Sequence, residues 1–134
     1  MQRIVIDTNI FVSALLSPKG NSAEIIDKIG NEESYLYYSK EILAEYKEVL
    51  SREKFNFDIA KQNKIINRIE RFGNLVDPSA SNIILSDESD RIFYDTAKEA
   101  NAILITGNIK HFPKEDFIKT PAEYLEYIKE KGYL

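Results

Sequence analysis

Short apolar runs and stretches of helical spacing alternate along this chain. The short runs, which predict buried strands, cover residues 3–6, 34–39, 74–77, 102–106 and 117–119. Segments with apolar residues every three or four positions, which predict amphipathic helices, cover residues 9–16, 22–29, 40–51, 59–72 and 88–101. Thr120-Pro121-Ala122-Glu123 predicts the start of a last helix, as a capping box with proline in the first turn.

This alternation predicts an α/β fold with a central, mostly parallel sheet of about four to five strands flanked by helices. No repeat or linker interrupts the pattern, so we expect one domain over residues 1–134. Parallel sheets of this kind bind ligands outside the carboxyl ends of their strands. Two such ends carry polar residues, at 7–9 and at 106–108, and the chemistry is expected there.

Composition narrows the function classes. The chain has 134 residues, 43% hydrophobic and 30% charged, which is typical of a globular protein. It has no cysteine, which excludes disulfides and thiolate metal sites, and no apolar run approaches the length of a membrane span. We therefore expect a cytoplasmic protein. The net charge of −4 argues against nucleic-acid binding by bulk electrostatics, but not against an enzyme that holds phosphate through a metal ion.

Asp7 follows directly on the first predicted strand. One interpretation is a helix N-cap, because aspartate is favoured at that position. The other is a ligand in the cleft, in which case Thr8 or Asn9 would cap the helix instead. Asp7 taken alone does not decide between them.

Other acids fall where the same cleft is expected. Glu45 lies at the border of the apolar stripe of its helix, whereas Glu41 and Glu48 are expected on the solvated face. Asp87 and Asp90 lie at the start of the 88–101 helix, where acids are electrostatically favoured. Asp95 lies in the middle of that helix among apolar residues, where capping does not explain it.

Carboxylates gathered in one cleft repel one another and are costly to desolvate, so a cation is expected among them. Hard oxygen ligands without cysteine and with a single histidine indicate Mg²⁺ or Mn²⁺ and not zinc. Such an ion activates water and stabilises charge on a phosphate.

The order of these segments resembles the PIN-domain family. The run from Ile4 to Leu15 is similar to the opening of PIN domains, the run Glu41–Tyr46 to their intermediate helix, and the runs 90–97 and 102–108 to their second half. The resemblance implies a Rossmann-like sheet and a metal-dependent endoribonuclease that cleaves single-stranded RNA. Such proteins are often the toxin of a VapC-type toxin–antitoxin pair.

The resemblance also implies roles for individual residues. Asp7 would be the first metal ligand, Glu45 the second acid and Asp90 the third. Asp90 is preferred to Asp87 because it stands sixteen residues before Thr106. Asp95 would be an auxiliary catalytic acid on the same helix.

Asn108 departs from the family pattern, in which many members have aspartate. Asparagine keeps an oxygen that can ligate metal but gives up one negative charge, so weaker metal binding or loss of activity follows. Lys110 and His111 lie next to the expected cleft and are candidates to contact phosphate, unless they belong to a solvated loop anchored by Phe112. Asn9 and Thr106 are further candidates for substrate contact, although the Thr106 hydroxyl has a second possible role in orienting a carboxylate.

Several alternatives remain at this stage. A phospho-acceptor receiver domain needs a lysine after the last core strand and an aspartate after a middle strand, and we cannot place both in this chain. A haloacid-dehalogenase-like phosphatase needs an acid where Asn9 stands. A PIN fold that binds RNA or protein without cleavage is the third. As partners we expect an RNA substrate, a cognate antitoxin inserted into the cleft, and a second copy of the chain in a homodimer formed near Tyr46 and Phe55.

Overall fold

The computed structural model describes residues 2–31 and 34–132. The strands are β1 (Gln2–Ile6), β2 (Ser34–Tyr38), β3 (Asn74–Leu75), β4 (Ile103–Ile105) and β5 (Ile118–Lys119). The α-helices are α1 (Thr8–Leu16), α2 (Asn21–Asp27), α3 (Lys40–Leu50), α4 (Ile59–Phe72), α5 (Arg91–Ala100) and α6 (Pro121–Glu130). Two short 3-10 helices, η1 (Glu88–Asp90) and η2 (Ile109–His111), lie at the ends of loops.

The strands form one five-stranded sheet in the order β3-β2-β1-β4-β5. Every pairing is parallel, which confirms the expected α/β architecture. Strand β1 lies in the middle and pairs with β2 on one side and β4 on the other, with Ile4 opposite both Leu36 and Ile103. The carboxyl ends of β1 and β4 are therefore neighbours, although they lie about a hundred residues apart in the sequence.

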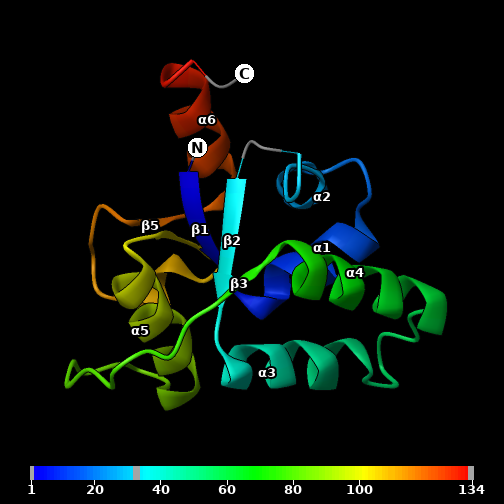
Figure 1. Ribbon diagram of the computed structural model, residues 1–134, viewed down its shortest axis with the longest axis horizontal. Coiled ribbons are helices and arrows are strands. Elements are labelled where there is room, and N and C mark those ends of the chain that lie inside the picture. The colour runs from blue at the N-terminus through cyan, green and yellow to red at the C-terminus, as the bar shows by residue number, and fades with distance from the viewer. Residues whose placement is uncertain (1, 32–33, 133–134) are drawn as a thin grey trace.

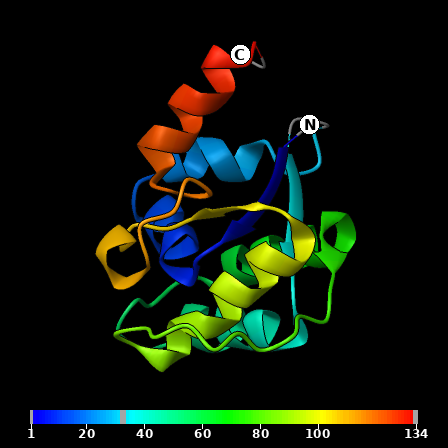
Figure 2. The same ribbon diagram turned by 90° about the vertical axis from the view of Figure 1, so that its left-hand side faces the viewer.

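Helices cover both faces of the sheet, as its continuous apolar strands require. Ile4, Val5 and Ile6 of β1 are completely buried. Helix α5 packs against β1, β2 and β4 on one face, which is turned toward the viewer in Figure 2. Helices α1, α2 and α4 lie on the other side, and α3 lies beyond the carboxyl ends of β1 and β2 (Figure 1).

The helix boundaries differ locally from the sequence prediction. The helix expected over 88–101 is divided into η1 and α5, and it ends at Asn101, whose φ of 52° is left-handed. Asparagine tolerates this conformation and often ends helices. The helix expected to reach Ile29 stops at Asp27, because Ile29 forms an isolated bridge with Ser34.

The remaining elements follow the prediction more closely. Strand β3 is only two residues long, although the amide of Val76 still donates to the carbonyl of Tyr38 at 2.9 Å. The capping box of α6 is confirmed: Thr120 and Glu123 each accept a hydrogen bond from the other's backbone amide. Within the described residues, no helix is both long and apolar enough to cross a membrane.

Candidate active site

Asp7 occupies the N-cap position of α1, but its side chain makes no capping hydrogen bond. Its carboxylate instead accepts a hydrogen bond of 2.7 Å from the Thr106 hydroxyl across the sheet, and it is only 5% exposed. Neither Thr8 nor Asn9 caps the helix with its side chain. Asp7 therefore stands at the N-cap position, but side-chain capping does not explain its carboxylate, which pairs with Thr106.

Thr106 positions the Asp7 carboxylate from the end of β4. It is completely buried, and its hydroxyl also accepts a hydrogen bond of 3.0 Å from the amide of Asn108. A buried threonine of this kind cannot reach a substrate, so its expected substrate contact is wrong. The alternative role, that of orienting a carboxylate, is the one the geometry gives.

Glu45 approaches Asp7 from α3. Its carboxylate accepts a hydrogen bond from the Thr8 hydroxyl, directly after Asp7 in the chain. The next residue, Tyr46, is completely buried, packs edge-on against Phe11 at 4.8 Å and donates to the carbonyl of Ile6. Tyr46 thereby fixes α3 to the end of β1, and Glu45 lies half-buried as its place on the stripe predicted.

Asp90 and Asp87 have different environments. The Asp87 carboxylate caps η1 by accepting hydrogen bonds from the amide and hydroxyl of Ser89. Asp90 Oδ2 is buried and has no hydrogen-bond partner in the described structure, and the His111 Nδ1 lies 3.5 Å away. Of the two acids, Asp90 is the one left available for a ligand.

These groups line one polar cleft of about 280 Å³ at the carboxyl ends of the strands. Asp7, Glu45, Asp90, Asn108, Asn9 and His111, all expected from the sequence, share it. Phe112 is buried behind His111, so the loop is both anchored as expected and part of the cleft.

Three residues of the loop after α3 also line the cleft, namely Arg52, Lys54 and Phe55. The sequence pattern does not predict a cleft role for this loop. The loop follows a helix and carries no strand-end signal, and only the tertiary packing returns it to the carboxyl ends of the strands.

Two predicted site residues lie elsewhere. Asp95 is buried on α5 and accepts a hydrogen bond of 3.1 Å from the amide of Ser81, so the structure does not bring it to the cleft. Lys110 is exposed and lines a separate depression with Lys119 and Glu123. The prediction that Tyr46 lies at an exposed dimer surface is also wrong, because its side chain is 0% exposed.

The three cleft acids resist ionisation. Burial raises the pKa of Asp7, and the negative charge of Asp90 raises it further, against the lowering effect of the Thr106 hydrogen bond. Burial likewise raises the pKa of Glu45, and Asp7 adds to the effect. The pKa of Asp90 is raised by burial and by Asp87 and Glu45, while His111 opposes the shift. Each acid thus lies in a field that a cation would relieve.

The donor chemistry fits a hard divalent cation, since it consists of carboxylate oxygens and the amide oxygen of Asn108. Among the described residues, no three Asp, Glu, His or Cys side chains are close enough to hold a metal ion jointly. Mg²⁺ commonly keeps several waters and binds through one or two carboxylates. The buried Oδ2 of Asp90, which lies 3.5 Å from His111 Nδ1, and the repulsion between Asp90 and Asp7 fit an ion held in that manner.

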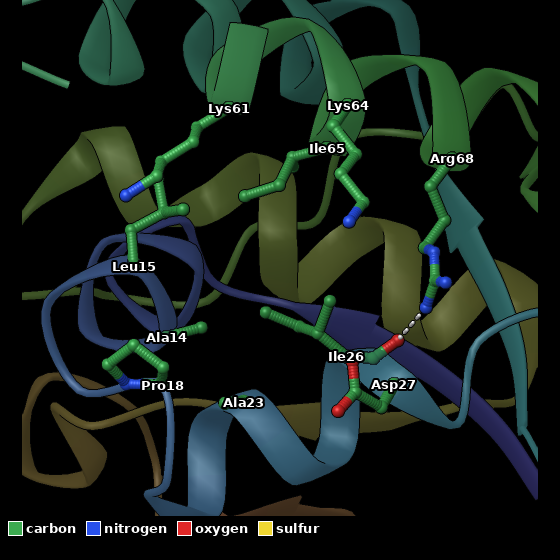
Figure 3. A pocket seen from close by; sticks show the side chains of 10 residues that line it. All are labelled: Ala14, Leu15, Pro18, Ala23, Ile26, Asp27, Lys61, Lys64, Ile65 and Arg68. Atoms are coloured by element: carbon green, nitrogen blue, oxygen red, sulfur yellow. Dashed lines mark hydrogen bonds between the residues drawn. The ribbon is translucent and has the colours of Figure 1, made fainter. Parts of the chain in front are cut away.

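A second cavity lies between α1, α2 and α4 (Figure 3). Ala14, Leu15, Ala23, Ile26 and Ile65 give it an apolar lining, and Lys61, Lys64 and Arg68 project from α4 beside it. Arg68 donates to the carbonyl of Ile26 at 3.0 Å. The lining holds one carboxylate, Asp27, and no further group suited to catalysis, so the polar cleft is the better candidate for chemistry.

Three comparisons bear on this cleft. A family model described as PIN domain matches residues 3–110. The uncharacterized protein MJ1680 of Methanocaldococcus jannaschii is 33% identical over 109 residues, which are 79% of this chain and 70% of that protein. The fold is similar to a chain in the crystal structure of VapBC2 from Rickettsia felis bound to a DNA fragment from their promoter. That match has a TM-score of 0.54 and 19% identity, and covers 81% of this chain and 90% of the other.

Proposed function

This chain belongs to the PIN-domain family, and we propose that it is a metal-dependent endoribonuclease that cleaves single-stranded RNA. PIN domains are typically metal-dependent nucleases, which supports a phosphodiester hydrolase at the level of the family. The observation that carries the proposal is the cleft in which Asp7, Glu45 and Asp90 converge from three elements with raised pKa values. Structural roles do not account for three under-neutralised acids in one place.

Asp7, Asp90 and Asn108 are the residues that would hold Mg²⁺ or Mn²⁺. When bound, such an ion activates water and stabilises the charge that develops on a phosphate. Burial raises the pKa of Glu45, which makes its carboxylate a stronger base, and the Thr8 hydroxyl holds it in place. Glu45 would accept a proton in the reaction. Asn9 and His111 line the same cleft and would contact phosphate oxygens of the substrate.

We propose an antitoxin as a protein partner of the same site. The crystal structure of VapBC2 from Rickettsia felis, whose fold this chain shares, supports this assignment. An arginine of such a partner would pair with the cleft carboxylates. We further propose that the protein is cytoplasmic and forms a homodimer. Size-exclusion chromatography with light scattering tests the dimer.

The second candidate is a module that binds RNA or protein without cleavage. Asn108 favours it, because an amide supplies one negative charge fewer to the cation than the aspartate of many PIN domains. The two candidates differ in whether purified protein hydrolyses RNA.

The deciding experiment incubates purified protein with single-stranded RNA in Mg²⁺, Mn²⁺ or chelator, with Asp7→Asn as the matched variant. We expect cleavage with metal, none with chelator, and a loss greater than the ~10–100-fold typical of outer-shell changes in Asp7→Asn. Cleavage that survives Asp7→Asn would identify a contaminant. No cleavage of any RNA, together with no metal binding by calorimetry, would establish the binding module instead.

A further inference from the structure

The loop after α3 brings an aromatic side chain to the edge of an otherwise polar cleft. Phe55 and Lys54 line the same cavity as Asp7, Glu45 and Asp90. An apolar ring beside buried carboxylates contributes nothing to metal binding, which uses oxygen ligands. Metal binding therefore does not explain why Phe55 lies at the cleft, whereas contact with a substrate would.

The Phe55 ring has one face supported from within the protein. It stacks on Phe57 with the ring centroids 5.3 Å apart and the planes tilted by only 10°. The Lys54 ammonium lies 5.0 Å from the Phe55 centroid. Two rings this close leave no room for an ammonium group between them, so Lys54 lies over the face of Phe55 that Phe57 does not cover.

The backbone of this loop is held in place before any ligand arrives. The amide of Phe55 donates to Arg52 at 3.2 Å, and the amide of Asn56 donates to Glu53 at 3.0 Å. Asn56 has a left-handed φ of 49°, which turns the chain between the two phenylalanines. The side chain of Gln62 donates to the carbonyl of Phe57 at 2.9 Å and ties the loop to α4.

The charge of the chain indicates what this ring is for. With a net charge of −4, the protein gains little from bulk attraction to phosphates, so RNA affinity has to come from local contacts. Aromatic side chains bind single strands by stacking on unpaired bases, largely without regard to sequence. A cation over an aromatic ring at an exposed site contributes little, and Lys54 is exposed, so moving its ammonium from the ring to a neighbouring phosphate costs little.

We propose that Phe55 is a nucleobase subsite, on which an unpaired base next to the scissile phosphate stacks while Lys54 pairs with the adjoining phosphate. The inference rests on the proposed ribonuclease function. It adds that the cleft selects unpaired RNA because a base inside a duplex presents no free face to Phe55.

The test measures binding separately from cleavage. A short fluorescein-labelled single-stranded RNA of mixed sequence is titrated by anisotropy, in the presence of chelator, with wild type and with Phe55→Leu and Phe55→Trp. We expect Phe55→Leu to weaken binding roughly 10-fold or more, and Phe55→Trp to restore it. A fluorescent adenine analogue in the RNA should be quenched by wild type and Phe55→Trp but not by Phe55→Leu.

Phe72→Leu is the matched control, because Arg71 lies over the Phe72 ring at 5.3 Å in the same kind of pair, outside the cleft. It should leave binding unchanged. In cleavage assays, Phe55→Leu should raise KM with a smaller change in kcat. When the RNA lacks the base beside the cut, Phe55→Leu and wild type should cleave it equally well.

The outcomes separate the two proposals. If wild type cleaves RNA and Phe55→Leu binds and cleaves equally well, the subsite is wrong and the ribonuclease stands. If wild type cleaves nothing but Phe55→Leu still loses binding and quenching, the ribonuclease is wrong and the subsite stands. Equal loss in Phe55→Leu and Phe72→Leu would also overturn the subsite, since it would reflect general destabilisation.

Discussion

Acidic residues of this protein form two groups with opposite environments, although one member of the first group, Asp87, also lines the cleft of the second. At the starts of η1 and α6, Asp87 and Glu123 accept hydrogen bonds from backbone amides, which lower the pKa of each carboxyl. In the cleft, burial raises the pKa of Asp7, Glu45 and Asp90, and the three acids raise one another's values further. The first group stabilises helices in its ionised form, and the second destabilises the fold when ionised.

This difference separates structural acids from candidate functional acids without reference to sequence motifs. At the starts of η1 and α6 the carboxylates turn back to backbone amides, which satisfy them. Asp7 and Asp90 also occupy N-cap positions, at α1 and α5, but their side chains make no capping hydrogen bond. In the cleft, Asp7 accepts from the Thr106 hydroxyl and from the Thr8 backbone, Glu45 accepts from the Thr8 hydroxyl, and His111 lies beside Asp90. These partners do not offset the effect of burial, since the pKa of each acid stays raised. A bound cation would neutralise the negative charge of the cleft carboxylates that their hydrogen bonds do not offset.

Thr106→Val should have the largest effect on the cleft side of this comparison. Valine keeps the shape of the side chain but removes the hydrogen bond to Asp7 and leaves the amide of Asn108 unpaired. We expect metal-dependent RNA cleavage to fall about 10–100-fold, as is typical for groups that orient metal ligands. The measurement is kcat/KM at increasing Mg²⁺, and Thr106→Ser should recover most of the activity.

Thr96→Val is the control for Thr106→Val. Thr96 is also completely buried, but its hydroxyl has no hydrogen-bond partner in the described structure. Its replacement should leave cleavage unchanged. If Thr106→Val behaved like Thr96→Val, the hydrogen bond to Asp7 would have no role in the site.

Asp7→Asn should stabilise the protein in chelator, with a gain at neutral pH on the order of 1 kcal/mol. Because burial raises the folded-state pKa of Asp7, wild-type stability falls as pH rises above the ordinary carboxyl range. Asparagine carries no charge, so the advantage of the variant should disappear as pH falls well below the ordinary aspartate pKa of about 4, where the carboxyl is protonated in both states. Urea unfolding across this range measures the difference, and a less stable variant at neutral pH would contradict the comparison.

Thr120→Ala should act in the opposite direction, on the structural side of the comparison. It removes the hydroxyl that accepts from the amide of Glu123, at a cost of about 1 kcal/mol in the free energy of unfolding. Cleavage should be unchanged under folding conditions, because α6 begins outside the cleft. A selective loss of cleavage would show that the two regions are coupled.

Asp87→Asn should give the smallest effect, because asparagine also caps helices well. The lowered pKa of Asp87 means that its contribution is present above the ordinary carboxyl range and is lost as pH falls through the lowered value. We expect a slight fall in Tm at neutral pH that vanishes in acid, which is the reverse of the Asp7→Asn profile. A rise in Tm at neutral pH would show that ionised Asp87 destabilises the fold, as the buried acids Asp7, Glu45 and Asp90 do.

The fold was largely predictable because its strands are short apolar runs and its helices have clear stripes. The boundaries of the elements were less predictable. Asn101 ends α5 through its left-handed backbone, and Ile29 lies outside the helix and forms a bridge with Ser34. Such features depend on tertiary contacts that no local pattern records.

The cleft was predictable where its residues follow strands, as Asp7 and Asn108 do. It was not predictable where packing decides. Asp95 occupies a helix position near Asp90 but turns toward Ser81, and Phe55 reaches the cleft only because its loop folds back. Spacing along a helix places a side chain on a face, but it does not identify the segment that covers that face.

The central position of β1 has a consequence for protein synthesis. Asp7 is synthesised before its hydrogen-bond donor Thr106, which follows 99 residues later, and Asp90 and Asn108 also come long after Asp7 and Glu45. A nascent chain that ends before residue 90 holds Asp7 and Glu45 but has neither the strand nor the helix that completes the cleft. Interrupted translation therefore releases fragments without the cleft.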